Sequence, residues 1–545
     1  NAHTVVLSTE FVDVTSGSGL VHCAPGCGPE DYEVGHANDI PPLNTLDTKG
    51  VFSPESGPFA GMRALKDDPA IIETIKKKGA LVAVTPVEHE YPHDWRHHQP
   101  VIFRTTKQWF FKVEDMKEEM IAANKEIRWI PDAAFNAFDA WLRNLRDNSI
   151  SKQRYWGTPI PIWRNVTDEK DYLVIGSAQE LEKLSGKKVG DDLHISFVDS
   201  IEIQKDGRTY RRIPDILDVW VDAGTASWNC LNFPREKKTF EQLFPATFIL
   251  EGKDQIRGWF NLLHVASMVA LGRISFKNCY MHGFVQDAEG RKMSKSLGNY
   301  ILPSEVIEKQ GADTLRYYMI GGANPAMDLN YNSEDMGIKF RNLNVLWNLY
   351  HFLIDFAHHN NIRPSATAPA KSAAPCAEGV EERYILSKLH STIRKATAAH
   401  EAYLLNQAPL IAESLFLELS RTYVQSVREK SASGTDEEKQ TILDTLFIVL
   451  LENLKLLAPV VPFVTEAIYL NLREAFSLEE ESIHLMAWPA AGEGKIDEAL
   501  EKDMETSKAV IQAVLAAREK AGYGVRWPLQ EAIIISTNKE TESAV

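Results

Sequence analysis

The sequence predicts a parallel α/β region followed by an α-helical bundle, and a smaller strand-rich α/β unit that precedes both. Strand-like runs at 246–251 and 279–286 flank a helical stretch from about 256 to 272, an order that is typical of a parallel sheet. After about residue 333 the apolar residues change to helical spacing. A chain of 545 residues has room for roughly three to four domains of about 150 residues each.

The composition is that of a globular chain with an acidic balance. Lys and Arg number 59 against 75 Asp and Glu, which leaves a formal charge of −16. Hydrophobic residues make up 44% and charged residues 25%, so a largely disordered chain is excluded. The acidic balance excludes a uniformly basic protein that coats nucleic acid, although a local basic stripe can still bind it.

Cysteine usage and hydropathy indicate the compartment. Five cysteines in so long a chain favour a reducing environment over a disulfide scaffold. The most apolar late stretch, 441–470, is interrupted by Asp444, Glu452 and Lys455, so no membrane-spanning segment is predicted. These observations predict a cytoplasmic chain without a membrane partner.

The chain before the predicted parallel sheet falls into three stretches. Residues 1–85 alternate short apolar runs with Gly, Pro and Ser turns, and this pattern predicts the small strand-rich unit. From about 86 to 164 the sequence becomes aromatic and basic. Residues 165–212 resemble a polar insertion with mixed strand and helix signals.

The final third predicts an amphipathic helical bundle. Ser333 is expected to cap a helix that starts just after it, with Glu334 and Asp335 in the first turn. Residues 362–380 form a Pro-, Ala- and Ser-rich connector. The apolar positions at helical spacing are Leu343, Leu346, Leu349, Tyr350 and Leu353, then Ile385, Leu389 and Ile393, and later Leu443, Leu446, Leu450 and Leu454.

Residues 282–299 carry the most informative motif. An apolar strand ends at Val285, a turn follows, and three cations then lie within five residues: Arg291, Lys292 and Lys295. Three cations so close together repel one another unless an anion sits among them. Hydroxyl donors and a flexible Gly298 complete what a mobile phosphate clamp needs, namely charge that meets a leaving pyrophosphate. A solvated basic turn is the alternative.

This motif resembles the Lys-Met-Ser-Lys-Ser signature of the class I aminoacyl-tRNA synthetases, which Lys292 to Ser296 match without change. The resemblance implies a Rossmann catalytic domain that condenses an amino acid with ATP, accompanied by Mg²⁺, and passes the acyl group to a tRNA. It assigns Lys292 and Lys295 a catalytic role. The ATP-binding residues that it implies are His282, Lys292, Met293, Ser294, Lys295 and Ser296.

Three further strings are similar to the isoleucyl subgroup of this family. They lie at 251–260, at 218–224 with Val221 and Ala223 as departures, and at 151–159 with one Arg-to-Lys change at Lys152. By this resemblance Glu251 contacts the adenylate, and indoles form a rigid apolar wall for a branched aliphatic side chain. The substrate-binding residues so implied are Glu251, Gly252, Asp254, Gln255, Trp259 and Trp220. The alternative is that both tryptophans are core aromatics.

A second, hydrolytic site is expected because apolar pockets reject a ligand one methylene smaller only weakly. Residues 17–35 resemble the editing segment of isoleucyl enzymes. The resemblance implies that Asp31 holds the α-ammonium of the mischarged residue and that His22 contacts the terminal ribose. Taken alone, Asp31 is better explained as a turn or helix-cap carboxylate and His22 as a satisfied strand histidine.

The helical third resembles the anticodon-binding bundle of the same family at 417–428 and 457–463. Arg421 and Arg428 lie seven residues apart, on one face of an unbroken helix, where they could contact phosphates. Solvated helix charges explain them as well. The partners implied are tRNA(Ile), isoleucine and ATP, and a monomer is expected.

The other signature of the class I family, His-Ile-Gly-His, is absent from the sequence. We therefore expect an N-terminally truncated chain that begins inside the editing insertion and does not aminoacylate by itself. The expected fold class is α/β: the second half of a Rossmann-type domain with a strand-rich editing insertion and a C-terminal helical bundle. The expected domains are the editing insertion (1–105), the catalytic domain with the polar insertion (106–332), the anticodon-binding domain (333–490) and a C-terminal junction region (491–545).

No zinc site is predicted. Cys23 and Cys27 have no second pair, and a structural zinc normally takes four ligands. The histidines near residue 93 are interpreted as structural or solvent-facing. Two alternatives to the isoleucyl assignment stay open: a valyl enzyme, and a non-catalytic fragment that binds or edits tRNA.

Overall fold

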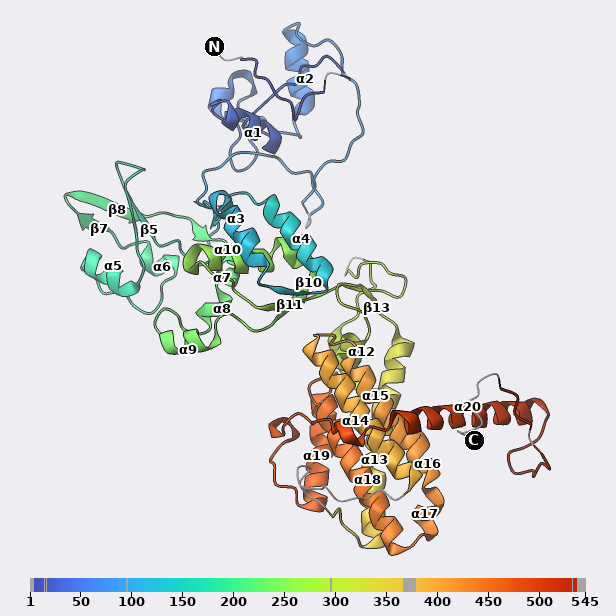
Figure 1. Cartoon of the computed structure of the whole chain (residues 1–545). Helices are drawn as coiled ribbons and strands as arrows, with labels where there is room; N and C mark the ends of the chain where they lie inside the picture. The colour runs from blue at the N-terminus through green and yellow to red at the C-terminus, as the bar shows by residue number, and fades with distance from the viewer. Residues whose placement is uncertain are drawn as a thin grey trace. The chain divides into compact units, whose positions relative to one another are not determined.

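The computed structural model describes residues 4–13, 15, 17–94, 97–294, 297–365, 379–531 and 533–536. The chain forms two compact units (Figure 1). One unit contains Asn1–Phe111 and Ser149–Ile216, and the other contains Lys112–Asn148 and Leu217–Val545. Within the described ranges, no helix combines the length and apolar character that crossing a membrane requires.

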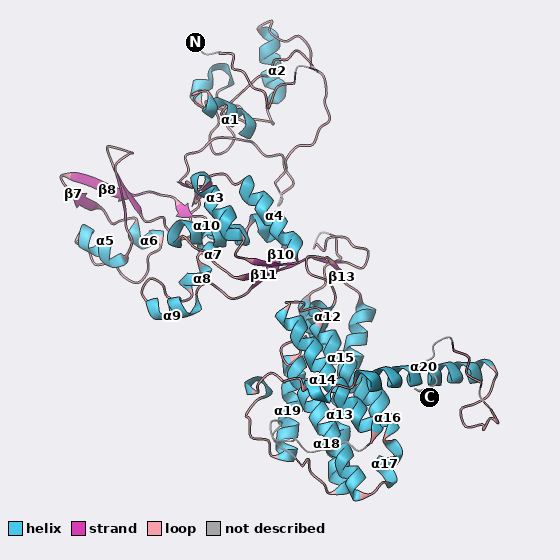
Figure 2. Ribbon diagram, in the orientation of Figure 1, coloured by secondary structure: helices cyan, strands magenta, loops and turns pink. Residues whose placement is uncertain are grey.

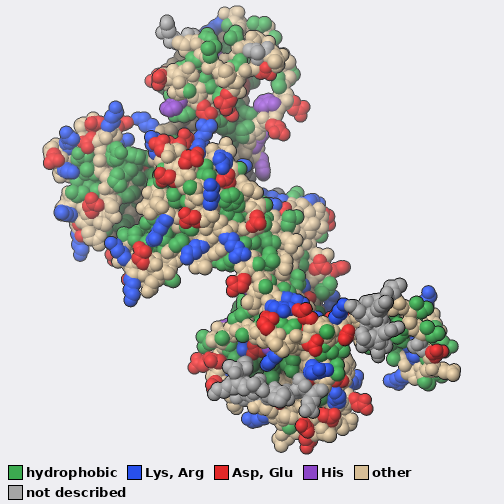
Figure 3. Space-filling model, in the orientation of Figure 1, with side chains coloured by type: hydrophobic (Ala, Val, Ile, Leu, Met, Phe, Trp, Pro, Cys, Tyr) green, Lys and Arg blue, Asp and Glu red, His purple; other side chains and the backbone are tan. Residues whose placement is uncertain are grey.

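The N-terminal part of the first unit corrects one expectation. Residues 4–105 form α1 (Pro29–Ala37), η1 (Pro54–Phe59) and α2 (Asp68–Lys77). In the described part of this range the β pairing is limited to isolated bridges, so the expected strand-rich unit is wrong. The apolar runs around Val5 and Leu20 are largely exposed, and a strand without a neighbour leaves its backbone groups unpaired. Figure 3 shows apolar side chains on the visible face of this part.

The polar insertion folds into a small antiparallel sheet with two helices. Its strands have the order β6-β5-β8-β7, and α5 packs against the sheet. Trp163 and Tyr210 lie in its core, and the Trp163 indole donates to the Ile201 carbonyl at 2.7 Å. The elements are β5 (Ile162–Asn165), β6 (Tyr172–Val174), α5 (Ala178–Ser185), α6 (Ile195–Val198), β7 (Ile203–Lys205) and β8 (Arg208–Arg212).

The second unit contains a three-stranded parallel sheet. Its strands are β10 (Ile249–Gly252), β11 (Asn278–His282) and β2 (Arg128–Ile130), in the order β10-β11-β2. Helix α10 (Trp259–Leu271) connects β10 to β11 and is buried from Phe260 to Met268. This arrangement confirms the predicted strand–helix–strand order (Figure 2).

Shorter helices and strands complete the two units. Helix α7 (Val219–Gly224) packs on α10 so closely that a Cβ at Gly224 would lie 2.6 Å from the Leu262 carbonyl oxygen. The position therefore requires glycine. The other elements are β1 (Phe110–Phe111), η2 (Glu114–Met116), α3 (Lys117–Asn124), α4 (Asp132–Arg143), β3 (Asn148–Ser149), β4 (Ser151–Lys152), β9 (Ile216–Leu217), α8 (Ala226–Asn229), α9 (Lys237–Leu243), η3 (Lys253–Arg257), β12 (Val285–Gln286), α11 (Pro303–Gln310), α12 (Ala312–Gly321) and β13 (Leu329–Asn330).

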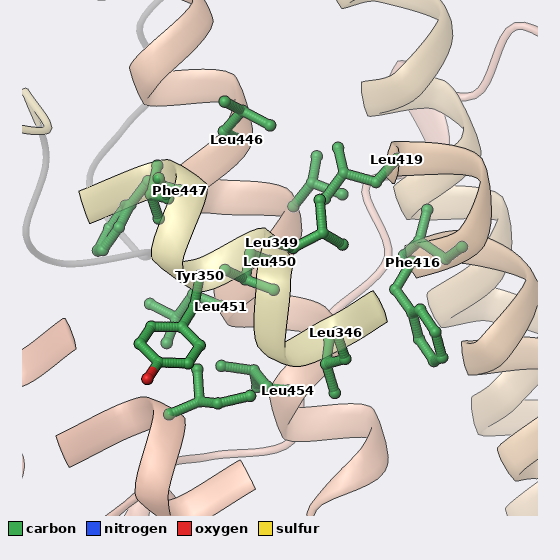
Figure 4. Packing of buried hydrophobic residues seen from close by; sticks show 14 of the residues in the cluster. Leu346, Leu349, Tyr350, Phe416, Leu419, Leu446, Phe447, Leu450, Leu451 and Leu454 are labelled. Atoms are coloured by element: carbon green, nitrogen blue, oxygen red, sulfur yellow. The ribbon is translucent and has the colours of Figure 1, made fainter. Parts of the chain in front are cut away.

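The remainder of the second unit is a helical bundle with one large apolar core (Figure 4). The predicted positions from Leu343 to Leu454 are all buried in it, which confirms the helical periodicity. The elements are α13 (Ser333–Asn360), α14 (Val380–Glu401), α15 (Ala408–Glu418), the π-helical η4 (Leu419–Tyr423), α16 (Val424–Ser426), α17 (Arg428–Ser433), α18 (Asp436–Leu457), α19 (Pro462–Phe476), η5 (Ile483–Leu485), η6 (Glu493–Lys495) and α20 (Glu498–Lys520).

Two local predictions in the bundle are corrected. The cap of α13 is Asn332 and not Ser333, because the Asn332 side chain accepts from the backbone N–H of Glu334 at 2.8 Å. Between Arg421 and Arg428 the helix passes through a π turn and ends near Val427, so their spacing does not place them on one helix face. Most of the predicted connector, 366–378, lies outside the described residues.

Candidate active site

The carboxyl ends of β10 and β11 bring three predicted residues to one edge of the sheet. Glu251 lies opposite Met281, and Gly252 lies opposite His282 in the parallel register. Glu251 and His282 are exposed to solvent, and the His282 ring is held by the Gly283 carbonyl. Open parallel sheets bind their ligands at this edge, so these groups stand where a nucleotide or amino acid can be bound.

The indole of Trp259 is fixed in place at the start of α10. Its backbone N–H donates to the Gln255 side-chain oxygen at 2.8 Å, and its ring N–H donates to the Ala223 carbonyl at 2.9 Å. Gln255 in turn donates to Asp254 at 3.1 Å. Because its ring N–H is already satisfied, the half-buried indole can offer apolar surface to a ligand without leaving a polar group unpaired.

Trp220 lies on α7, the helix that packs against α10. Its backbone N–H donates to the Asp218 carboxylate at 2.8 Å, while 45% of the residue is exposed. A core role therefore does not account for Trp220. The two predicted pocket tryptophans lie on contacting helices.

Asp328 ties the pocket segment to the strand that leads into the cationic loop. Its carboxylate pairs with Lys253 at 2.7 Å and accepts from the Phe284 backbone N–H at 2.8 Å. Lys253 contributes most to lowering the pKa of Asp328. The chain approaches so closely here that a Cβ at Gly283 would overlap the Met327 carbonyl. Sequence reasoning missed Asp328, since it belongs to none of the motifs.

The cationic loop is a hairpin whose base is held by a backbone bridge and by a hydrogen bond between two side chains, those of Asp287 and Asn299. Gln286 and Lys292 form an antiparallel bridge, and the buried Asp287 carboxylate accepts from Asn299 at 2.8 Å. Hydrogen bonds from Asn299 and then from Arg291 hold the pKa of Asp287 at about 2. Among the predicted ATP-binding residues, Lys292 is exposed and Met293 and Ser294 are half-buried. Lys295 and Ser296 lie outside the described residues.

The charge of Arg291 is already paired within the loop. Its guanidinium contacts Asp287 at 2.8 Å and Glu289 at 3.1 Å. The negative charge that the sequence pattern predicts beside Arg291 is therefore supplied by the carboxylates of the loop itself. Lys292 forms no ion pair with any residue that the structure describes, so its ammonium remains available to an incoming phosphate.

The predicted editing residues lie in the first unit. Asp31 is in the first turn of α1, where a carboxylate complements the helix dipole, and Cys23 donates to its backbone carbonyl at 3.6 Å. This contact lays the segment containing His22 against the start of α1. His22 itself is exposed. Burial and then the nearby Asp31 charge raise the pKa of the Cys23 thiol.

Metal ligands do not cluster in the described ranges, where no group of three or more His, Cys, Asp or Glu side chains could hold an ion. We therefore name no residue as a ligand of Mg²⁺. Among the described residues of the loop after β12, Arg291 is ion-paired and Lys292 is not.

Two protein families match the chain. Residues 10–332 match the model of tRNA synthetases class I (I, L, M and V), and residues 382–534 match the anticodon-binding domain of tRNA ligase.

Curated relatives match nearly the whole chain. The isoleucine--tRNA ligases of Pyrococcus horikoshii and Thermococcus kodakarensis are each 39% identical over 99% of this chain and 52% of their own length. That of Methanocella arvoryzae is 39% identical over all of this chain and 49% of its own length. The chain thus spans about half the length of the curated relatives it matches.

Solved structures share the fold. Methionyl-tRNA synthetase of Mycobacterium tuberculosis in complex with methionyl-adenylate has a TM-score of 0.50 at 19% identity, covering 69% of this chain and 65% of that chain. A second structure of the same enzyme has a TM-score of 0.50 at 18% identity, covering 72% and 69%.

Proposed function

The chain belongs to the class I tRNA synthetases of the I, L, M and V group, and on this premise we propose that it serves the ligation of isoleucine to tRNA(Ile). The reaction has two steps: isoleucine and ATP form isoleucyl-adenylate and pyrophosphate, and the acyl group then passes to the tRNA ribose. The observation that carries the proposal is the meeting of Glu251, Gly252 and His282 at one sheet edge, with the anchored Trp259 opening the helix that follows β10.

In the proposed first step the isoleucine carboxylate attacks the α-phosphorus of ATP, and the bond to the pyrophosphate oxygen breaks. Negative charge then builds on the leaving group. By their motif, Lys292 and Lys295 are proposed to neutralise that charge. Such neutralisation lowers the barrier most when it acts on charge that develops in the transition state. Mg²⁺, when bound with ATP, supplies further neutralisation of the phosphates.

Glu251 and the two tryptophans are proposed to select and orient the amino acid. An exposed carboxylate can bind the α-ammonium or a ribose hydroxyl through a charge-assisted hydrogen bond. Trp220 and Trp259 offer flat apolar surfaces to a branched side chain. Gln255 and Asp254 act on the same slot, because Gln255 holds the Trp259 backbone and is itself held by Asp254.

We further propose that Asp31 and His22 belong to a hydrolytic editing site that clears valyl-tRNA(Ile). The support is the contact of Cys23 with Asp31, which brings the two parts of the motif together. In the full-length gene product, Asp31→Ala is expected to let valyl-tRNA accumulate while isoleucine activation stays near normal. Clearance of valyl-tRNA at the wild-type rate would refute the assignment.

Amino-acid-dependent ATP–pyrophosphate exchange tests the activation step. The full-length gene product is assayed with isoleucine, valine, leucine and methionine, and isoleucine is expected to give the highest kcat/KM. Lys295→Ala is expected to slow exchange severely, whereas Lys309→Ala, a control on α11, leaves it unchanged. A preference for valine would favour the valyl alternative, and exchange with none of the four would favour a non-catalytic fragment.

A further inference from the structure

Asp287 is a charged group in an unusual place. It lies directly before a loop proposed to bind a polyanion, yet only 5% of the residue is exposed. A buried carboxylate near phosphate costs desolvation and repulsion unless its charge is compensated locally. Its contacts show how that compensation is arranged.

Four donors converge on the Asp287 carboxylate. The backbone N–H of Arg291 donates at 2.7 Å, the Arg291 side chain at 2.8 Å and the Glu289 backbone N–H at 3.2 Å. The fourth donor is the Asn299 amide at 2.8 Å, from the far end of the loop. Bonds of this kind to a carboxylate are roughly twice as strong as neutral ones.

The Asn299 side chain also bonds to backbone groups that precede it in the loop. Its amide oxygen accepts from the Ser294 backbone N–H at 2.9 Å, and its amide nitrogen also reaches the Lys292 carbonyl at 3.3 Å. The two side chains therefore hold backbone groups on both sides of Met293. An Asn side chain suits this place because it donates and accepts at once.

We propose that Asp287 and Asn299 are positioning residues that hold the hairpin so that Lys292 is presented to the phosphates of ATP. The inference rests on the proposed function for the identity of the bound anion. The hydrogen bonds that Asp287 and Asn299 make within the loop are called the staple. The Arg291 guanidinium is part of it, because it is ion-paired with Asp287, and it is therefore not free to bind the phosphates. Lys292 is left as the residue whose backbone is held and whose ammonium is unpaired within the described ranges.

Limited trypsin digestion of the chain tests the staple without any catalysis. Trypsin cuts after Arg291 and Lys292, and cleavage is faster when the backbone around them is released from its hydrogen bonds. We expect Asp287→Asn and Asn299→Ala to speed cleavage there by about tenfold or more, the factor that losing a charge-assisted hydrogen bond implies. Glu289→Gln is the matched control, because this exposed acid also contacts Arg291 but accepts no backbone bond from the loop. Equal cleavage rates in all four proteins would overturn the staple.

Isoleucine-dependent pyrophosphate exchange by the full-length gene product tests the link to ATP. Asp287→Asn is expected to lower kcat about tenfold or more, with the KM for isoleucine unchanged, and the double variant is expected to be no worse than the poorer single variant. A merely structural role would instead lower the melting temperature and impair all parameters together, as would general misfolding, and either result overturns the proposal.

The two proposals fail in distinguishable ways. Wild-type kcat in both Asp287→Asn and Asn299→Ala overturns the positioning role while leaving the proposed function standing. No isoleucine-dependent exchange by the wild-type protein overturns the proposed function and the assignment of ATP as the bound anion, even where the digestion result supports the staple.

Discussion

The helical bundle and the N-terminal segment 4–105 use similar apolar residues with opposite results. In the bundle, residues at helical spacing are buried together in one apolar core (Figure 4). In the N-terminal segment, Leu7 and Val82 are 93% and 100% exposed. A helix satisfies its backbone within itself, whereas a strand needs another strand. Apolar residues thus stabilise the fold only where their element also has a partner to pack on.

The largest expected effect comes from the bundle core. Phe416 is fully buried in α15, so Phe416→Ala should lower the free energy of unfolding by about 3–5 kcal/mol through lost burial and a cavity. Phe463→Ala is the control, since that ring is 66% exposed, and it should cost no more than about 0.5 kcal/mol. Urea unfolding measures both, and equal losses would break the comparison.

A buried histidine extends the comparison to the parallel sheet. Burial lowers the pKa of His264 on α10 to about 4, from an ordinary value near 6.5. The folded protein holds His264 neutral down to about pH 4, whereas in the unfolded chain the ring binds a proton below about pH 6.5. The free energy of unfolding should therefore fall as the pH drops from about 6.5 to 4. The full loss is about 3 kcal/mol at 1.36 kcal/mol per pKa unit. Urea unfolding of His264→Gln should lack this slope, and an unchanged slope would contradict the assignment.

A smaller effect is expected at the start of α18. The Thr435 side chain accepts from the Glu438 backbone N–H, and the Glu438 carboxylate accepts from the Thr435 backbone N–H. Thr435→Ala should therefore cost about 1 kcal/mol. Thr441→Ala in the same helix removes only a bond to a carbonyl four residues earlier and should cost less. Thermal unfolding of both variants ranks them, and the reverse order would count against the cap.

The smallest effect is expected in the N-terminal segment. Val82→Ala and Leu20→Ala replace exposed side chains and should each change the unfolding free energy by less than about 0.5 kcal/mol. Chemical denaturation followed by tryptophan fluorescence measures the unfolding free energy of both variants. A loss above about 2 kcal/mol would mean that these residues pack against something in solution, and it would erase the contrast with the bundle.

Local pattern explains how much of the fold could be predicted. The spacing from Leu343 to Leu353 marks a helix because one period describes the whole element, and the family matches confirm a class I catalytic region followed by an anticodon-binding domain. The run at Val5–Leu7 carries an equally apolar pattern, but pairing depends on a distant strand. The cap of α13 moved by one residue because Asn332 and Ser333 are both good caps, and only geometry decides between them.

The candidate site divides in the same way. Motifs predicted Glu251, Trp259 and Lys292, since each lies inside a short recognisable string. Asp328 could not be predicted, because its pairing with Lys253 spans 75 positions and depends on two chain segments meeting. Asn299 stands at the end of a known motif, yet its bond to Asp287 follows only from the way the loop folds back.

Isoleucyl-adenylate is proposed to bind at the sheet edge that carries Glu251, with its side chain against Trp259, and titration calorimetry measures this binding directly. Isoleucyl-sulfamoyl-adenosine, an unreactive analogue, is titrated into the full-length gene product beside its valyl counterpart. The isoleucyl compound should bind about 10–200-fold tighter, the range general to apolar pockets and known for isoleucyl enzymes facing valine, and Trp259→Ala should abolish the difference. Equal affinity for both compounds, or an unaltered preference in Trp259→Ala, would contradict the assignment.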